Sequence, residues 1–292
     1  MNLVHISTYL SKKQFSFICL FISILSINIG QAQTRSEFAI EAGGIFNKLT
    51  YELSSEDASI NHSDGASIGI GYSFYLKPQW AISIGGIYQH YQSEARFGIL
   101  QGSYTATDIE GENFEFRYTA TDYSEEQNLN VVHIPLTLQF QTEGDTKIYV
   151  RAGGQIGILL SSEYTSITER LSTSGYYPQY DAELFDPQFM GFGTYNNLKA
   201  PARELDWNTS FSAVLEAGVK REAGKNSHLY IGFFINYGLN TISNDNREEA
   251  LVAYQTSKPD DFLFNSIFST GNAKQARLQS FGVKLRYAFG GY

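Results

Sequence analysis

Two histidines lie in polar surroundings that could support acid–base chemistry near neutral pH. His62 is part of the tetrapeptide Asn61-His62-Ser63-Asp64, which contains the three side-chain types of a hydrolytic triad, and His90 follows later in the chain. Adjacent positions do not make a triad, because each role requires a particular geometry between the groups. An enzyme is therefore an alternative here, and a non-enzymatic protein is favoured.

Cofactor motifs are missing from the sequence, which contains no Gly-rich phosphate loop, no His-Glu-x-x-His pair and no calcium-loop spacing. Asp108, Glu110 and Glu112 flank Gly111 with a spacing that is suggestive of a divalent-cation site. Solvated acids at the tip of a hairpin are the favoured interpretation of the same residues. We therefore expect no cofactor, and cation binding by these acids stays open.

Aromatic side chains are concentrated between residues 161 and 206, where they are interleaved with glycine and proline. So much aromatic surface must be covered by something. It either binds a protein or a glycan, because Tyr and Phe supply rigid contact area, or it folds back and packs on the neighbouring loops. Both interpretations stay open for the six candidate residues, which are Tyr176, Tyr177, Tyr180, Phe185, Phe189 and Phe192.

The first 32 residues must be separated from the elements that position these side chains, because they have the pattern of an export signal. Two lysines precede an apolar run over 15–27, and small residues end at Ala32. The run is too short for a membrane-spanning helix, which needs about 20 apolar residues. We expect a signal peptide over 1–32 and a mature chain that starts at Gln33. The only cysteine, Cys19, would leave with the signal, which excludes disulfides and cysteine chemistry from the mature protein.

The remaining chain, 33–292, has the composition of one large β-domain rather than two ordinary domains. Aromatic residues make up 15% and charged residues 17% of the sequence, and this charged fraction lies below the roughly 25% of soluble domains. No stretch after the signal approaches a transmembrane helix. A membrane-spanning structure would therefore need closed strands, because only helices and barrels satisfy every backbone group in lipid.

Apolar side chains alternate with small or polar ones over 66–76, which is the period of a strand with lipid on one face and a lumen on the other. The pattern resumes over 80–88 after a short turn at 77–79, so these two segments predict a hairpin. The same signature recurs over 38–46, 132–140, 148–160, 211–219, 229–239 and 281–289. Eight strands are an even number, which returns both termini to the same side.

Short and long connections alternate strictly between the predicted strands. The short ones lie near 77–79, 141–146 and 221–227, and the long ones at 49–64, 93–128, 161–206 and 241–274. Bacterial barrels show this asymmetry, with tight periplasmic turns and long extracellular loops. We therefore predict an all-β fold, a transmembrane antiparallel up-and-down β-barrel of about eight strands with its termini in the periplasm. Within the second loop, 97–107 and 113–121 could pair with each other or add two strands.

Charged side chains in the predicted strands give a second test, because Lys or Arg on the lipid face costs about 2–4 kcal/mol at mid-bilayer. All of them fall on the inward register, namely Glu37, Glu41, Lys147, Arg151, Glu216, Lys220, Lys284 and Arg286. An eight-stranded barrel is just wide enough for its own side chains to fill it. We therefore expect a buried ionic network that closes the lumen, in preference to a transport path. Its candidate members are Glu41, Arg151, Glu216, Lys284 and Arg286.

The net charge of −9 conceals a division between loops and barrel. Each of the four long connections carries more acids than bases, whereas the strands with their turns are net positive. Acidic loops make nucleic acid an improbable partner. They suit divalent cations or a cationic partner, although a solvated charged surface is the commoner reason for such loops.

Four motifs carry a resemblance to a known family. They are Gly30-Gln31-Ala32-Gln33, Asn130-Val131-Val132-His133-Ile134-Pro135-Leu136, Tyr149-Val150-Arg151-Ala152-Gly153-Gly154 and Gly282-Val283-Lys284-Leu285-Arg286-Tyr287-Ala288-Phe289. With them, nearly all of 33–292 resembles the PorT-like small outer-membrane β-barrels, comparable in architecture to the eight-stranded OmpA and OmpX barrels. The resemblance implies the outer membrane of a Gram-negative bacterium, contact with its lipid, and insertion by the barrel-assembly machinery, which recognises an aromatic-ended last strand. We assign that signal to Phe289, because Tyr292 falls out of the alternating register.

The leading hypothesis is a non-enzymatic, monomeric outer-membrane barrel that displays acidic, aromatic-rich loops for interaction or for an accessory role in the envelope. Its partner would be an extracellular or envelope protein or a glycan. One alternative is a PorT-like component of a secretion apparatus. The other is a lipid-modifying or proteolytic outer-membrane enzyme with His62 or His90 at the extracellular rim. The ligand and the physiological role do not follow from the sequence.

Overall fold

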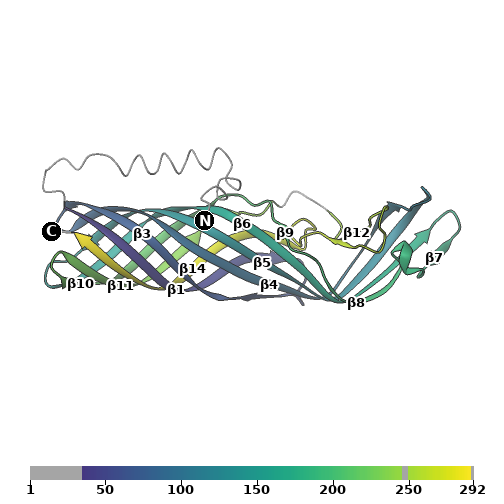
Figure 1. The fold of residues 1–292 in the computed structure, drawn as a ribbon, viewed down its shortest axis with the longest axis horizontal. Helices are drawn as coiled ribbons and strands as arrows, with labels where there is room; N and C mark the ends of the chain where they lie inside the picture. The colour runs from purple at the N-terminus through teal and green to yellow at the C-terminus, as the bar shows by residue number, and fades with distance from the viewer. Residues whose placement is uncertain (1–34, 245–248, 291–292) are drawn as a thin grey trace, which may run out of the picture. The chain divides into compact units, whose positions relative to one another are not determined.

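The computed structural model describes residues 35–244 and 249–290. The predicted signal peptide, 1–32, and the predicted mature start at Gln33 lie outside the described residues. Long antiparallel strands make up most of the described chain (Figure 1). None of the helices in this described part has the length and apolar character needed to cross a membrane.

Eight long strands form a closed ring. Each pairs antiparallel with the ring strands before and after it along the chain, and pairing of β1 with β14 closes the ring. The eight are β1 (Ser36–Leu53), β3 (Asp64–Lys77), β4 (Trp80–Thr107), β5 (Asn113–Gln141), β6 (Thr146–Tyr177), β10 (Ser210–Gly224), β11 (Ser227–Gly238) and β14 (Ala273–Gly290). The predicted antiparallel up-and-down barrel of eight strands is therefore confirmed.

The two ends of the ring differ in their connections. One end, which we call the turn end, holds the short connections at 78–79, 142–145 and 225–226, and β1 begins there beside the end of β14. The opposite end, which we call the loop end, holds the long connections and the tip of the β4–β5 hairpin. Three of the four predicted long connections are long in the structure, at 54–63, 178–209 and 239–272, whereas β4 and β5 are joined by the short turn 108–112. The predicted strict alternation of short and long connections is therefore only partly present.

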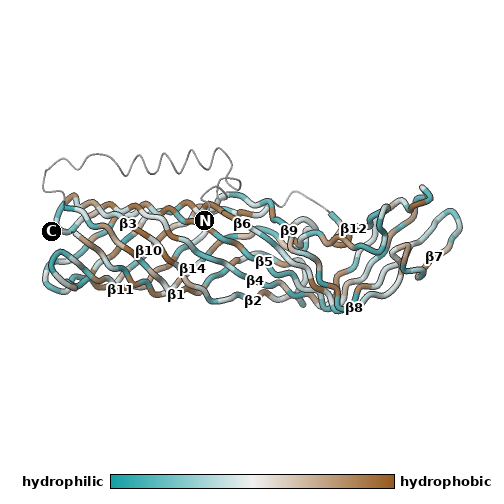
Figure 2. Tube along the Cα trace, viewed as in Figure 1, coloured by the Kyte–Doolittle hydropathy of each residue, from teal (hydrophilic) through white to brown (hydrophobic). Residues whose placement is uncertain are grey.

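Large apolar side chains point outward from all eight strands and form a belt around the barrel, visible as the recurring apolar positions in Figure 2. On β3, for example, Ile68, Tyr72 and Leu76 are exposed, while Ser67 and Ser73 between them are buried. In a bilayer each outward apolar side chain meets lipid, whereas in water a patch of this size calls for a partner. The belt therefore defines the membrane-spanning segments of the strands.

The charged residues of the strands take the opposite side. Lys147, near the turn end, is half-buried. The other seven predicted inward charges are buried, namely Glu37, Glu41, Arg151, Glu216, Lys220, Lys284 and Arg286. The predicted register is confirmed, because side chains on one strand alternate strictly between the two faces and a one-residue slip would have reversed all of them.

The second predicted loop, 93–128, is mostly strand, which corrects the boundary drawn from the sequence. β4 and β5 continue well past the belt as one hairpin, in which 97–107 and 113–121 pair with each other. They add no further strands to the ring. The third predicted loop, 161–206, is likewise strand as far as Tyr177, where β6 ends.

The physical reason for this difference lies in the extension, which is the part of β4, β5 and β6 beyond the belt. There the apolar side chains face inward and the polar ones outward, which is the reverse of the pattern in the belt. Phe114 and Phe116 of β5 face inward and are buried, whereas Glu115 and Arg117, which alternate with them, face outward and are only partly buried. In the belt the outward side chains are apolar because they meet lipid, but here they meet water. A strand prediction that is based on outward apolar residues therefore ends at the edge of the belt.

The long connections lie along these extended strands and pair with them. The short elements that they contribute are β2 (Ser59–His62), which pairs with β4; β7 (Ala182–Leu184), β8 (Gly193–Lys199) and β9 (Arg203–Glu204), which pair with β6; the 3-10 helix η1 (Gln188–Met190); and the pair β12 (Val252–Ala253) and β13 (Leu263–Phe264). The connections are therefore ordered by backbone pairing with the barrel strands.

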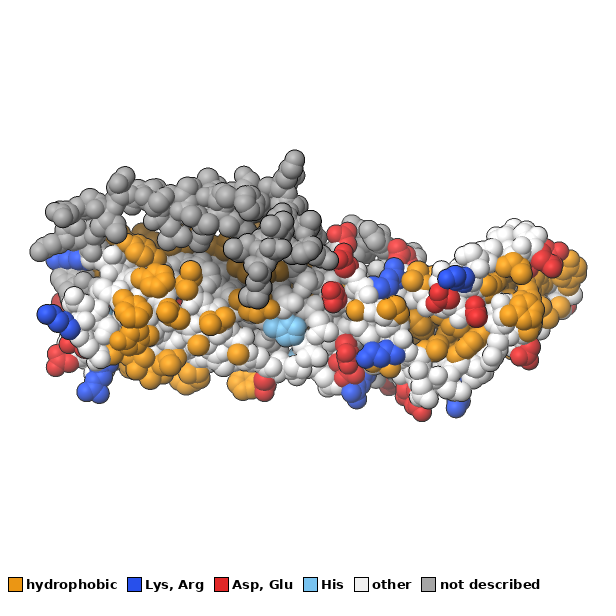
Figure 3. All heavy atoms as spheres, in the orientation of Figure 1, with side chains coloured by type: hydrophobic (Ala, Val, Ile, Leu, Met, Phe, Trp, Pro, Cys, Tyr) orange, Lys and Arg blue, Asp and Glu red, His pale blue; other side chains and the backbone are white. Residues whose placement is uncertain are grey.

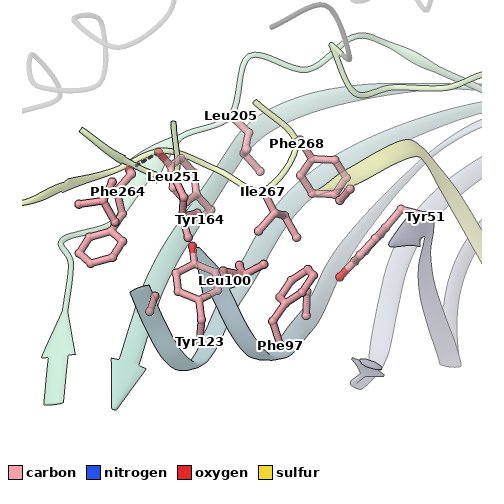
Figure 4. Packing of buried hydrophobic residues seen from close by; sticks show 14 of the residues in the cluster. Tyr51, Phe97, Leu100, Tyr123, Tyr164, Leu205, Leu251, Phe264, Ile267 and Phe268 are labelled. Atoms are coloured by element: carbon pink, nitrogen blue, oxygen red, sulfur yellow. Dashed lines mark hydrogen bonds between the residues drawn. The ribbon is translucent and has the colours of Figure 1, made fainter. Parts of the chain in front are cut away.

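A hydrophobic core fills the loop end of the barrel. Figure 4 shows Ile267 and Phe268, from the last connection, gathered with Phe97 of β4 and other aromatic side chains of the strands. The Tyr164 hydroxyl donates to the carbonyl of Phe264 at 3.0 Å, which fixes the same connection on β6. The last connection thus covers the mouth of the barrel.

Candidate functional site

Four buried charged side chains meet in the barrel lumen. Arg286 pairs with both carboxylates, with Glu41 at 3.2 Å and with Glu216, and Lys284 pairs with the same two at 3.5 and 3.3 Å. The four residues come from β1, β10 and β14, and the inward register of these strands brings them together. Each carboxylate therefore faces two cations, which is the arrangement that buried charges require.

Arg151, the fifth predicted member of the network, lies opposite Glu216 on the neighbouring strand β6. Its guanidinium donates to neutral groups, to Gln139 Oε1 at 2.9 Å and to Ser83 Oγ at 3.3 Å. The five residues together comprise two carboxylates and three cations. The group therefore keeps one positive charge in excess.

A second polar cluster lies nearer the turn end, and the sequence reveals only part of it. Lys220 pairs with Glu37 at 2.6 Å and donates to the Tyr75 hydroxyl at 2.8 Å. Tyr230 donates to the same Glu37, and His228 Nδ1 lies 3.1 Å from it. Alternation places Glu37 and Lys220 inside, but it does not show which groups meet across the lumen. That depends on strand stagger, for which the sequence carries no local signal.

These clusters leave little space inside the barrel. The cavity lined by Glu41, Arg151 and their neighbours measures about 20 Å³, which is room for about one water molecule. Further toward the loop end, His133 contacts the Tyr91 hydroxyl at 3.0 Å and the Gln155 amide at 3.3 Å, and the hydrophobic core follows. Side chains thus fill the lumen along its described length.

The two histidines considered for catalysis lie on β4 and β2, near the loop end. His90 Nδ1 lies 3.0 Å from the amide oxygen of Asn130, whereas the base of a hydrolytic triad is oriented by a carboxylate. His62 is exposed, and partial burial of its ring together with nearby Lys48 lowers its pKa. This geometry gives catalysis no specific support.

The six aromatic candidates of the third connection divide into two groups. Tyr177 and Phe192 are buried and pack against Phe114 of β5, with ring centroids 5.3 and 5.4 Å away. Phe192 also lies directly on the backbone of Gly175, where an added Cβ atom would come within 2.4 Å of the ring. Both residues therefore anchor the connection on the extended strands.

The other group lies at the surface. Tyr180 and Phe185 are 63% exposed and Phe189 is 67% exposed, while Tyr176 is half-buried beneath the guanidinium of Arg117. Figure 3 shows hydrophobic side chains gathered near β7 and separated from the belt by a zone rich in charged side chains. We use the name aromatic rim for the four exposed side chains Tyr180, Leu184, Phe185 and Phe189, which include the neighbouring Leu184 and leave out the half-buried Tyr176.

A pocket of about 310 Å³ lies between the tip of the β4–β5 hairpin and the segment that follows β6. We call it the tip pocket. Acidic residues of the hairpin form one wall, and residues of the third connection form the other. Its lining residues are Asp108, Glu110, Glu112, Tyr177, Tyr180, Ala182, Leu184 and Met190.

The three acids of the tip pocket have different roles. Asp108 builds the turn, because its Oδ1 accepts the backbone N–H groups of Glu110 and Glu112 at 2.9 Å each, and its Oδ2 accepts the Tyr177 hydroxyl. Glu112 accepts the Tyr180 hydroxyl at 2.9 Å, and this hydrogen bond raises the pKa of Tyr180. Glu110 and Glu112 therefore hold the negative charge at the pocket, whereas Asp108 holds its shape.

Metal binding by these acids finds no geometric support. Within 35–244 and 249–290, no group of three or more His, Cys, Asp or Glu side chains is arranged to hold a metal ion. The carboxylate of Asp108 already accepts three hydrogen bonds within the protein. The spacing seen in the sequence is therefore explained by the turn itself.

A closed ring of eight antiparallel strands, with an apolar belt outside and paired charges inside, defines a membrane β-barrel. Residues 31–244 match the family described as outer membrane protein beta-barrel domain, and this match covers more than half of the chain. The chain therefore belongs to this family, and its place is the outer membrane of a Gram-negative bacterium.

Several small outer-membrane proteins of known structure are similar to this chain at low sequence identity. Neisserial surface protein A is 11% identical, with 86% of this chain and 95% of that chain covered and a TM-score of 0.35. OprG from Pseudomonas aeruginosa is 8% identical, with 89% and 99% covered and a TM-score of 0.39. Ail, the attachment invasion locus protein of Yersinia pestis, is 10% identical, with 88% and 100% covered and a TM-score of 0.33. No curated protein matches the chain.

Proposed function

We propose that this outer-membrane barrel is a non-enzymatic binding protein whose partner contacts the loop end, and whose lumen serves stability rather than transport. A single contrast carries the proposal. Paired charges fill the lumen, whereas the aromatic rim is exposed at the surface of the loop end.

The interior supports the first half of the proposal. Glu41 and Glu216 each face two cations, and the cavity beside them has room for about one water molecule. A solute could pass only if these pairs separated, which would leave buried charges without partners in the low-dielectric lumen. A transport path through this lumen would therefore be closed nearly all of the time.

The aromatic rim supports the second half. Aromatic side chains are enriched at binding surfaces because they provide a large contact area with few rotatable bonds. The buried residues Tyr177 and Phe192 hold the third connection on β5 and β6, so the rim above them has a fixed support. Such a surface suits an extracellular or envelope protein or a glycan.

The proposal includes an orientation. The turn end, with both termini, faces the periplasm, and the loop end faces the outside of the cell. The unequal lengths of the connections support this orientation, since bacterial barrels keep tight turns on the periplasmic side. The aromatic rim then meets partners outside the cell or bound at its surface.

Two alternatives make different predictions. A PorT-like component of a secretion apparatus should co-purify with other envelope proteins after mild detergent extraction, whereas the proposed binding protein should be recovered as a solitary barrel. An enzyme that used His62 or His90 should lose activity in the variant His62→Asn/His90→Asn. The proposed binding at the rim should be the same in that variant.

Two measurements on the purified, membrane-inserted protein test the proposal. In planar bilayers it should give no steady single-channel conductance. In lipid nanodiscs it should bind members of a printed array of peptides and glycans, and the triple variant Tyr180→Ala/Phe185→Ala/Phe189→Ala should lose this binding. A stable conductance would refute the closed lumen, and an unchanged array signal from the triple variant would refute the role of the rim.

A matched control comes from the outer face of the extension. Ile99 on β4 is 63% exposed, as Tyr180 and Phe185 are, but it lies outside the aromatic rim. Ile99→Ala should therefore bind the array as the wild type does. All variants should show the same heat-dependent shift in gel migration, which establishes that the barrel is folded.

A further inference from the structure

We infer that the tip pocket and the aromatic rim together bind a basic polypeptide, with a Lys or Arg side chain in the pocket and its apolar neighbours on the rim. This inference rests on the proposed binding function and specifies the chemistry of the partner. Three features of the described residues carry it: charge, the walls of the pocket, and the extent of the rim.

Charge is the first feature. The two segments that supply every lining residue of the pocket except Tyr177, 106–114 and 179–192, contain no Lys or Arg. They contain six acids, which are Asp108, Glu110, Glu112, Asp181, Glu183 and Asp186. Arg117, further down β5, is paired with Glu115 at 2.8 Å and with Glu183 at 3.1 Å. The remaining negative charge attracts cationic partners and repels anionic ones, such as acidic glycans.

The walls of the pocket are the second feature. They combine the carboxylates of Glu110 and Glu112 with the Tyr180 ring and the apolar side chains of Leu184 and Met190. A Lys or Arg side chain matches both kinds of wall, because its methylene stem packs on apolar groups while its charged head meets carboxylates and an aromatic ring. The volume of about 310 Å³ lies at the lower end of the range for ligand pockets. A neutral sugar would leave the carboxylates without a charged partner.

The extent of the rim is the third feature. Phe185 and Phe189 do not line the pocket, but they directly adjoin the lining residues Leu184 and Met190 in the sequence and expose more than half of their surface. A small organic cation would fill the pocket and leave these rings in water. A polypeptide with apolar side chains next to its Lys or Arg would cover both surfaces at once. The polypeptide therefore accounts for the pocket and the rim together.

The site is held in place before any partner binds. Glu112 fixes the Tyr180 hydroxyl at 2.9 Å, and Asp108 fixes the Tyr177 hydroxyl at the same distance. Phe192 packs below them against Phe114. A site whose side chains are already ordered loses less entropy on binding.

The test uses the full barrel in nanodiscs of zwitterionic lipid and the fluorescence anisotropy of short labelled peptides. A peptide in which Arg and Leu alternate should bind. A peptide in which Glu and Leu alternate should not bind, and one in which Arg and Ser alternate should bind more weakly because it cannot cover the rim. Added salt should weaken binding of the Arg–Leu peptide, since exposed charges are screened over about 10 Å at 0.1 M.

Two variants locate the peptide on the protein. Glu110→Gln/Glu112→Gln should weaken binding of the Arg–Leu peptide about tenfold or more, and Phe189→Ala should weaken it to a similar extent. Gln at position 112 keeps an oxygen that can accept the Tyr180 hydroxyl, so the pocket keeps its shape. The control Asp145→Asn/Glu222→Gln removes two exposed acids at the turn end and should bind as the wild type does.

The outcomes separate this inference from the proposed function. Equal affinity of wild type and Glu110→Gln/Glu112→Gln, or equal binding of the Glu–Leu peptide, overturns the inference. If the Arg–Leu peptide does not bind, but the array yields a glycan that the aromatic triple variant loses, the inference fails and the proposed binding function stands. If the aromatic triple variant changes no binding at all, both fail.

Discussion

Replacement of Glu216 with Gln perturbs the paired lumen at its centre. The Glu216 carboxylate is buried, lies 3.3 Å from Lys284 Nζ, pairs with Arg286 and accepts the Tyr149 hydroxyl at 2.8 Å. Gln keeps the shape of Glu, but it removes the charge and turns an amide N–H toward groups that are themselves donors. Lys284 and Arg286 are then left with the single carboxylate of Glu41.

The size of the effect follows from the pairing. Removing one partner of a buried ion pair costs about 3–5 kcal/mol, and we expect the lower end, about 3 kcal/mol, because Glu41 still neutralises part of the charge. With a urea dependence of about 1–3 kcal/mol per M, the unfolding midpoint should fall by about 1–3 M. Unfolding from lipid vesicles can be followed by the fluorescence of Trp80 and Trp207. Glu222→Gln, on an exposed part of the same strand, should stay within about 0.5 kcal/mol of the wild type.

A double variant sharpens the test. Glu216→Gln/Arg286→Met removes one carboxylate and one cation together, so it should lose less stability than the two single variants summed, by about 1 kcal/mol or more. Additive losses, or a Glu216→Gln protein as stable as the Glu222→Gln control, would refute the reasoning that paired charge holds the lumen closed.

Three further predictions follow from other parts of the fold. Burial raises the pKa of Glu125, which accepts the backbone N–H of Ile267 at 2.8 Å, from 4.5 to about 7. A carboxyl whose pKa is raised in the folded state contributes its full stability below its unfolded pKa and loses this contribution as the pH rises through 7. The thermal midpoint should therefore decrease as the pH is raised from about 5 to about 8. Glu125→Gln should remove much of this decrease. Phe192→Ala removes a buried ring, so it should destabilise the third connection by about 3–5 kcal/mol and speed its cleavage by trypsin. Phe189→Ala removes an exposed ring and should not speed cleavage. Equal cleavage of the two variants would contradict the division of these aromatic residues into buried anchors and exposed rim. Unboiled protein in detergent should migrate differently from boiled protein, and identical migration would contradict a closed barrel.

The barrel itself was predictable because one physical rule operates along the whole belt. Lipid outside and a polar lumen inside force strict alternation, so outward Ile68 and Tyr72 fix the inward position of Ser67 and Ser73. The same rule places Glu41 and Arg286 inside without knowledge of their partners. The partners themselves depend on the stagger between strands.

The loop end was less predictable because local pattern does not show what will cover a strand face. Phe114 and Phe116 face inward and are buried under the connections. The sequence of β5 alone does not indicate that connections will cover this part of the strand. Phe189 and Phe192 lie three positions apart in similar surroundings, yet one is exposed and the other buried. Phe192 packs on the backbone of Gly175 and on the rings of Phe114 and Tyr254, which lie far from it in the sequence.

The length of the strands bears on how the lumen and the tip pocket are related. β6 has 32 residues, whereas a bilayer needs about 9–11 residues per strand, so about 20 residues lie outside the span that lipid requires. Paired strands, rather than free loops, therefore carry the tip pocket away from the belt. Glu216→Gln should accordingly lower stability without changing binding at the pocket, and Glu110→Gln/Glu112→Gln should do the reverse. In a transport protein the lumen residues would determine both the stability of the barrel and the activity, so a lumen variant would change both. In a closed barrel with a surface site, lumen variants should change only stability and pocket variants should change only binding.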